Sequence, residues 1–184
     1  MADSARSLGL DLRAVLDDDV AFRAWFERTL PRVYAYLLSR SGSRVIAEDL
    51  TQEVFLEAIR SPATFDGRSD SLPWLIGIAR HRLAYHARRH ARDQERHERL
   101  VREVQVSDPQ TVAWQTATSR EATRLALRSL PSLQRIALVF RFQDQLSVRA
   151  VARELGRSED ATESLIRRAR QAFERRYREV TNAD

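Results

Sequence analysis

The stretch from Ser71 to Arg92, SLPWLIGIARHRLAYHARRHAR, constrains the fold most strongly, because its apolar residues recur at the spacing of an α-helix. One side of this predicted helix collects the residues that would be buried, namely Leu72, Leu75, Ile76, Ala79, Leu83 and Ala87. The opposite side interleaves aromatic and basic residues, namely Trp74, Ile78, His81, Tyr85, Arg88 and Arg92, with Arg82 and Arg89 beside them. We therefore predict a long amphipathic helix around which the chain is organised.

The aromatic and basic face of this helix has two interpretations. Aromatic rings stack on unpaired bases and arginines bind phosphates, so the face suits single-stranded nucleic acid. Alternatively, the helix is merely basic and solvated, and Trp74 and Tyr85 pack under a neighbouring loop, since aromatic residues at helical spacing are usually core residues. This stretch alone does not separate the two interpretations.

Composition limits the class of protein. Apolar residues make up 43% and charged residues 31% of the 184 residues, which is typical of a soluble globular protein rather than a disordered one. No apolar run is long enough to span a membrane and no signal peptide opens the chain, so we predict a cytoplasmic protein. The sequence has no cysteine, which excludes disulfides, thiol nucleophiles and cysteine-ligated metals.

The charge balance points to an acidic partner. The net charge is +5, which favours binding to a polyanion such as nucleic acid. All 31 basic residues are arginine, which binds phosphates and base edges better than lysine does. A GC-rich genome also favours arginine codons, so the placement of the arginines is more informative than their number.

The N-terminal part of the chain predicts one long helical run. Residues 1–16 are expected to form a mobile start that can include a short helix. Asp17, Asp18 and Asp19 offer an N-cap and a negative first turn to the run that follows. Pro31 is expected to kink this run or to split it in two, and the run should end at Ser41-Gly42-Ser43.

Two rows of residues follow the next predicted helix, from about residue 45 to residue 60. The apolar row is Leu50, Val54 and Ala58, supported by Phe55 and Ile59. The acidic row is Asp49, Glu53 and Glu57, with Gln52 alongside. Like charges four residues apart weaken an isolated helix by a few tenths of a kcal/mol per pair. An acidic row on a basic protein thus suggests a docking face for a basic partner, although an ordinary solvated face is the alternative.

A polar loop, SPATFDGRSDS, separates this helix from the central one. Ser61-Pro62 should stop the first helix, and Asp66-Gly67 predicts a turn. Phe65 is the only large apolar residue of the loop. We expect Ser71 to cap the central helix and Pro73 to lie in its first turn.

The histidines do not predict a metal site. All four lie in the central helix or in its charged extension towards Arg102, and His86 and His90 are four residues apart. Two histidines without a third ligand are a weak metal signal, so we predict neither a metal nor another cofactor. The histidines are expected to join the arginines on a polar surface that faces phosphates.

The composition changes at about Glu103 and indicates two small domains. We predict an all-α protein with a mobile N-terminus (1–16), a first helical domain (17–102), a flexible linker (103–117), a second helical domain (118–178) and a tail (179–184). The second domain opens with two apolar helices, at about 122–130 and 133–142, separated by Pro131.

The end of the second domain has the pattern of a helix-turn-helix. Ser147 should cap a short helix that ends at Gly156, and Ser158 should cap the long last helix. Small Ala152 lies where the two helices would cross, and the alternative is a helical hairpin used only for packing. The outward face of the last helix carries Asp160, Glu163, Ser164, Arg167, Arg168 and Gln171, which can contact base edges and phosphates.

Two pairs of segments together resemble a known family. DLTQEVFLEAIR followed by SLPWLIGIARHRLAYHARR is similar to region 2 of bacterial sigma factors of the extracytoplasmic-function (ECF) subgroup of the sigma-70 family. LRSLPSLQRIALVFRF followed by LSVRAVARELGRSEDATESLIRRARQAFERRY is similar to their region 4. The resemblance covers roughly residues 22–92 and 122–177, and the order, spacing and linker length agree. It implies a non-enzymatic subunit that directs promoter-specific transcription initiation.

The resemblance also implies partners and residue roles. The expected partners are core RNA polymerase, promoter DNA (duplex and single-stranded) and an anti-sigma factor. Docking on the coiled-coil clamp of the polymerase is implied for Asp49, Leu50, Gln52, Glu53 and Phe55. Recognition and melting of the −10 element are implied for Phe65, Trp74, Ile78, His81, Arg82, Tyr85, Arg88 and Arg89. Reading of the −35 element is implied for Ser158, Glu163, Ser164, Arg167, Arg168 and Gln171.

Three positions depart from the family pattern. The family often has asparagine where His81 stands, in the pocket for a flipped base, and basic residues where Glu163 and Leu165 stand. We therefore do not expect this protein to recognise the −10 and −35 sequences that are usual for the family. The alternative functions are a stand-alone helix-turn-helix regulator with a sensing or dimerising N-terminal half, and a nucleic-acid enzyme, for which the sequence has no catalytic set.

Overall fold

The structure is a computed structural model, and it describes residues 11–67, 70–101 and 119–182. No residue within these ranges lies in a β-strand, so the predicted all-α fold is confirmed. The chain divides into two compact units, residues 1–83 and 84–184, and the boundary falls inside helix α4 (Ser71–Val101). The predicted linker (103–117), most of the predicted N-terminal segment and the last two residues lie outside the described residues.

The first unit begins with a short helix and a long one. The side chain of Asp11 caps α1 (Leu12–Asp17), and the Asp18 carboxylate caps α2 (Asp19–Ser41) by accepting from the amides of Val20 and Ala21, both at 2.9 Å. Helix α2 runs through Pro31 without a break, because its buried stripe continues on both sides of the proline. That stripe is Trp25, Thr29, Val33 and Leu37. Gly42, at φ 70°, ends the helix as predicted.

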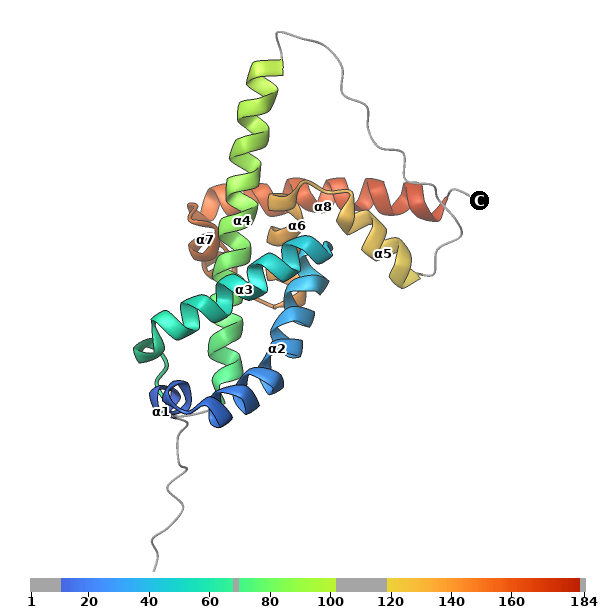
Figure 1. Ribbon diagram of the computed structural model, residues 1–184. Helices are drawn as coiled ribbons and strands as arrows, with labels where there is room; N and C mark the ends of the chain where they lie inside the picture. Colours follow the sequence, from blue (N-terminus) through green and yellow to red (C-terminus); the bar gives the residue numbers. More distant parts are fainter. Residues whose placement is uncertain (1–10, 68–69, 102–118, 183–184) are drawn as a thin grey trace, which may run out of the picture. The chain divides into compact units, whose positions relative to one another are not determined.

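Helix α3 (Arg44–Arg60) packs beside α2 (Figure 1). Its buried side carries Leu50, Val54, Phe55 and Ala58, as predicted. The Phe55 ring lies edge-on to two rings of α2, 5.5 Å from Trp25 and 4.8 Å from Phe26 between centroids. Ile59 was predicted to support this row, which is wrong: 42% of it is exposed.

The start of α4 corrects the predicted cap. A single 3-10 turn, η1 (Pro62–Thr64), follows α3, and Asp70 then caps α4 by accepting from the Leu72 amide at 3.2 Å. Ser71, the predicted cap, is fully buried, and its Oγ accepts from the Trp25 indole Nε1 at 2.8 Å. A buried indole N–H needs an acceptor, and the Ser71 hydroxyl is the acceptor for Trp25 of α2. The cap of α4 is therefore supplied by the preceding residue, Asp70.

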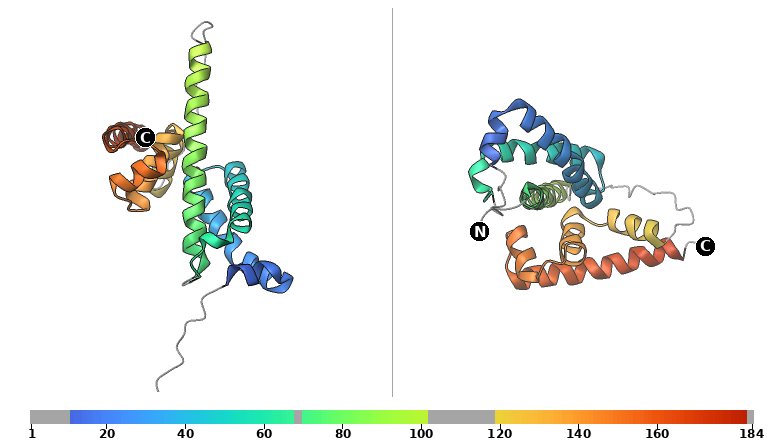
Figure 2. Two further views of the ribbon diagram at one scale, coloured as in Figure 1. Left: turned by 90° about the vertical axis from the view of Figure 1, so that its left-hand side faces the viewer. Right: turned by 90° about the horizontal axis from the view of Figure 1, so that it is seen from below.

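In the second unit, α8 (Glu159–Thr181) contacts each of α5 (Ser119–Arg128), α6 (Ser132–Leu138) and α7 (Val148–Leu155) (Figure 2). Buried Leu130, Leu138 and Ala169 form a core cluster, against which Leu127, Ile166, Ala172 and Phe173 pack. Burial lowers the pKa of Arg135 on α6, and repulsion from Arg128 lowers it further.

The structure divides the helix predicted over 133–142. It is α-helical to Leu138 and then forms a π-helical turn, η2 (Val139–Gln143), in which the Asp144 amide donates to the Val139 carbonyl at 3.0 Å. The wider turn keeps Val139 and Phe140 buried, and the left-handed Gln145 (φ 54°) then carries the chain towards α7.

Candidate polymerase and nucleic-acid interfaces

The exposed side of α3 carries the acidic row. Asp49, Gln52 and Glu53 are exposed, and Glu57 is half-buried. The other two residues predicted to dock, Leu50 and Phe55, are only 2% and 4% exposed. The structure therefore separates the predicted docking set into three surface residues and two core residues that hold the helix from beneath.

Exposed apolar residues on α3, which the sequence analysis missed, extend this face. Val45 is 66% exposed and Leu56 is 50% exposed. With Asp49 and Gln52 they follow steps of four, three and four residues, which places all four on one helix face. Val45 and Leu56 lie about three turns apart along this face, with the polar side chains of Asp49 and Gln52 between them. Counting the same steps of three and four residues from Val45, and not only from Leu50, would have predicted that Val45 and Leu56 share the exposed face.

Arg82 of α4 points to this acidic row. Its Nε donates to Glu57 Oε2 at 2.6 Å, and its Nη2 is also paired with Glu57. Its Nη1 lies 3.7 Å from Glu53 Oε2. The guanidinium of a residue predicted to contact −10 DNA is thus directed at two carboxylates on the docking helix.

The loop before α4 packs on Trp74. The Phe65 and Trp74 ring centroids are 5.4 Å apart, and the Trp74 Nε1 donates to Thr64 Oγ1 at 3.2 Å. This is the loop packing that the alternative interpretation predicted for Trp74. Both rings stay partly exposed, and Tyr85 is 48% exposed, so aromatic surface remains available to a ligand.

The basic and aromatic face continues along α4. Ile78 is half-buried and His81 is exposed, and steps of four and three residues place both on the Trp74 side of the helix. Further along, the Arg88 guanidinium lies 6.0 Å from the Tyr85 ring centroid. The Arg89 side chain is 73% exposed, and its nearest acid, Asp93, is at 3.9 Å. Such a face combines ring surface with cations.

Two histidines of α4 lie side by side. The rings of His86 and His90 are stacked with their centroids 6.3 Å apart. Within the described residues, no group of three or more histidine, aspartate or glutamate side chains is placed to hold a metal ion.

Helices α7 and α8 form the predicted helix-turn-helix. Ser147 and Ser158 cap them by accepting from the amides of Ala150 and Ala161, both at 3.2 Å, and Gly156 makes the turn at φ 57°. The predicted reading residues lie on the outer side of α8: Glu163, Arg167, Arg168 and Gln171 are exposed, and Ser164 is half-buried.

The two departures in α8 differ in kind. Leu165 is 5% exposed, so this substitution for a basic residue points into the domain and leaves the outer face unchanged. Glu163 is exposed and therefore changes the charge of the outer face. Of the two departures, only Glu163 changes the surface that α8 would present to a DNA duplex.

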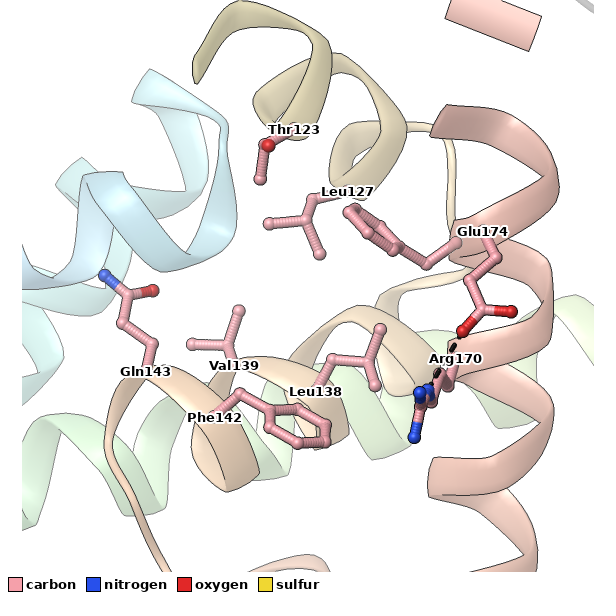
Figure 3. Close-up of a pocket in the computed structure, with 9 residues that line it drawn as sticks. Thr123, Leu127, Leu138, Val139, Phe142, Gln143, Arg170 and Glu174 are labelled. Atoms are coloured by element: carbon pink, nitrogen blue, oxygen red, sulfur yellow. Dashed lines mark hydrogen bonds and ion pairs between the residues drawn. The ribbon is translucent and has the colours of Figure 1, made fainter. Parts of the chain in front are cut away.

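A separate apolar pocket of about 450 Å³ lies between α5, α6, η2 and α8 (Figure 3). Its walls include Leu127, Leu138 and Val139. Arg170 and Glu174 line one side and are joined by a 2.9 Å ion pair, drawn as a dashed line in Figure 3.

The sequence matches two families, Sigma-70 region 2 over residues 17–93 and Sigma-70, region 4 over residues 120–173. It is also 33% identical over 174 residues to the ECF RNA polymerase sigma factor SigC of Mycobacterium tuberculosis, a match that covers 94% of this chain and 91% of SigC. The chain belongs to the ECF sigma factors of the sigma-70 family.

Two further similarities of this sigma factor differ in strength. It is 36% identical over 173 residues to the ECF RNA polymerase sigma factor BldN of Streptomyces coelicolor, covering 91% of the chain but only 64% of BldN. The solved structure of the sigma factor RpoE with the anti-sigma factor NepR from Bartonella quintana aligns with 89% of the chain and covers 98% of RpoE, at a TM-score of 0.49 and 23% identity. Family membership rests on the sequence matches. No described helix of this sigma factor is both long and apolar enough to cross a membrane.

Proposed function

We propose that this sigma factor binds core RNA polymerase and directs promoter-specific transcription initiation. The observation that carries the proposal is the exposed acidic face of α3 on a chain of net charge +5, and the aromatic and basic face of α4 supports it. The relatives are sigma factors, a class without enzymatic activity, and we infer the same of this chain. It would act in the cytoplasm with the polymerase and need no cofactor, and the family resemblance adds an anti-sigma factor as partner.

Docking on polymerase would use the mixed face of α3. Asp49 and Glu53 would pair with basic residues of the polymerase clamp, and Gln52 would add hydrogen bonds. The exposed side chain of Leu56 would add apolar contact area. Leu50 and Phe55 would act from the core, by fixing α3 against α2.

Opening of the −10 element would use the loop at 61–67 and the outer face of α4. Stacking on an aromatic ring stabilises an unpaired base by about 1–3 kcal/mol, which offsets the few kcal/mol lost on unstacking a base step. Phe65 and Thr64 hold Trp74 in place for that role. Exposed Arg89 would bind a phosphate, Arg88 would join it once its Nη1 leaves the Glu154 carbonyl to which it donates at 2.8 Å, and exposed His81 would face the flipped base.

Anchoring on the −35 element would use the N-terminal half of α8. Backbone amides of its first turn would meet a phosphate beside the acidic side chains of Glu159 and Asp160, and Arg167 and Arg168 are exposed further along. Exposed Glu163 can accept from a cytosine amino group, where a basic residue would instead bind guanine or phosphate.

Replacing Arg167 should selectively weaken −35 binding. We expect Arg167→Ala to reduce affinity for the duplex upstream of a mapped start site by about 1–3 kcal/mol, because a base contact is lost. Fluorescence anisotropy with specific and scrambled duplexes measures the change.

Arg175→Ala is the matched control, since Arg175 is also exposed on α8 but lies two turns further on. It should change binding to the two duplexes equally, if at all. Equal losses on specific and scrambled duplexes for Arg167→Ala would contradict base reading by α8.

Association with polymerase separates the proposed function from a stand-alone regulator. We expect the purified chain to co-elute with core polymerase from a GC-rich bacterium in gel filtration. A chain that binds duplex DNA and never co-elutes with polymerase would instead be a helix-turn-helix regulator.

A further inference from the structure

The contacts of Arg82 give it a role different from the one its sequence position suggests. Its Nε and Nη2 are both engaged by Glu57, and its Nη1 is directed at Glu53, 3.7 Å away. The side chains of Arg82 and Glu57 are each 33% exposed, so the pair is partly shielded from water. All three guanidinium nitrogens therefore face α3.

The position of the Arg82 guanidinium compensates the repulsion between two glutamates of α3. Glu53 and Glu57 are four residues apart, where like charges repel and weaken a helix. One guanidinium between them offsets the repulsion and limits the rotamers of both side chains. The Glu53 side chain remains 48% exposed, so part of its carboxylate is left for a partner.

We propose that Arg82 is a positioning residue of the polymerase-docking face rather than a contact for the −10 strand. The inference rests on the proposed function, because it assigns Arg82 to the face that would meet polymerase. Holding Glu53 and Glu57 in place before docking lowers the conformational entropy lost on binding, which is how preorganisation raises affinity. A phosphate contact would instead require Arg82 to leave both carboxylates.

The test compares two arginines of α4. Arg82→Ala should weaken affinity for core polymerase about 3- to 10-fold. At saturating polymerase it should leave affinity for a labelled, unpaired −10 oligonucleotide unchanged. Arg89→Ala is the matched control, because its side chain is 73% exposed and faces solvent. It should show the reverse pattern, with weaker oligonucleotide binding and unchanged polymerase affinity.

A second comparison separates positioning from general loosening of the fold. In a Glu57→Gln background, Arg82→Ala should cost less polymerase affinity than it does in the wild type, because the main partner of Arg82 is already altered. If Arg82 had a purely structural role, Arg82→Ala would lower the thermal unfolding midpoint. The effects of Arg82→Ala and Glu57→Gln on polymerase affinity would then be additive.

The outcomes are distinct. The inference is overturned if Arg82→Ala weakens oligonucleotide binding as Arg89→Ala does, if it leaves polymerase affinity unchanged or raised, or if the two residues are uncoupled. Failure of the wild-type chain itself to bind core polymerase would overturn the proposed function instead.

Discussion

Glu53→Arg should abolish binding to core polymerase while leaving the protein folded. The substitution places a cation where the basic clamp would approach, and like charges facing each other across an interface cost several kcal/mol, at least about 100-fold in affinity. Glu53 is exposed at the surface of α3, so the unfolding free energy should change by less than about 1 kcal/mol. Biolayer interferometry with immobilised core polymerase measures the affinity.

Glu27→Arg makes the same charge change at an exposed position of α2 and should bind polymerase normally. If Glu53→Arg binds with unchanged affinity, or if both variants lose affinity equally, α3 is not the docking face.

Trp25→Ala should be the most destabilising substitution in the first unit. Trp25 is 2% exposed, packs on Phe55 and donates to Ser71, so one side chain joins α2, α3 and α4. Truncating a buried aromatic side chain costs about 3–5 kcal/mol. Circular dichroism during urea unfolding should show the loss.

The hydrogen bond is tested by a milder pair of substitutions. Trp25→Phe leaves the Ser71 hydroxyl buried without its donor, and adding Ser71→Ala should recover part of that loss. Phe142→Ala removes an aromatic side chain that is 57% exposed and should change stability by less than about 0.5 kcal/mol. A loss for Trp25→Ala no larger than for Phe142→Ala would contradict its role in the core.

Local sequence signals predicted most of the helix ends. Asp18, Ser147 and Ser158 cap helices as expected, and Gly42 and Gly156 end them. Caps and left-handed turns depend on one residue and its near neighbours, so the sequence carries the whole signal.

The wrong predictions concern features that depend on tertiary contacts rather than on neighbouring residues in the sequence. Ser71 was predicted as a cap from its position, but Trp25 takes its hydroxyl from 46 residues away. The π-helical turn at Val139–Gln143 follows three successive buried residues of α6, and helical periodicity does not reveal where such a turn begins. Ile59 was assigned to the core although the buried stripe of α3 ends at Ala58.

The candidate sites show the same limit. The acidic row of α3 and the aromatic face of α4 were evident from spacing alone, because each lies on a single helix. The approach of Arg82 to Glu57 joins residues 25 positions apart on two helices, so it could be found only in the folded chain. The burial of Leu50 and Phe55 is likewise known only from the folded chain, and it indicates that they support α3 from the core rather than contact a partner.

Run-off transcription tests the central claim most directly. Core polymerase from a GC-rich bacterium would be incubated with fragments of the source genome, with and without the purified protein. The proposed function predicts transcripts that begin at discrete sites only when the protein is present, with shared −10 and −35 sequences upstream. Transcription that is absent, or identical with and without the protein, would contradict it.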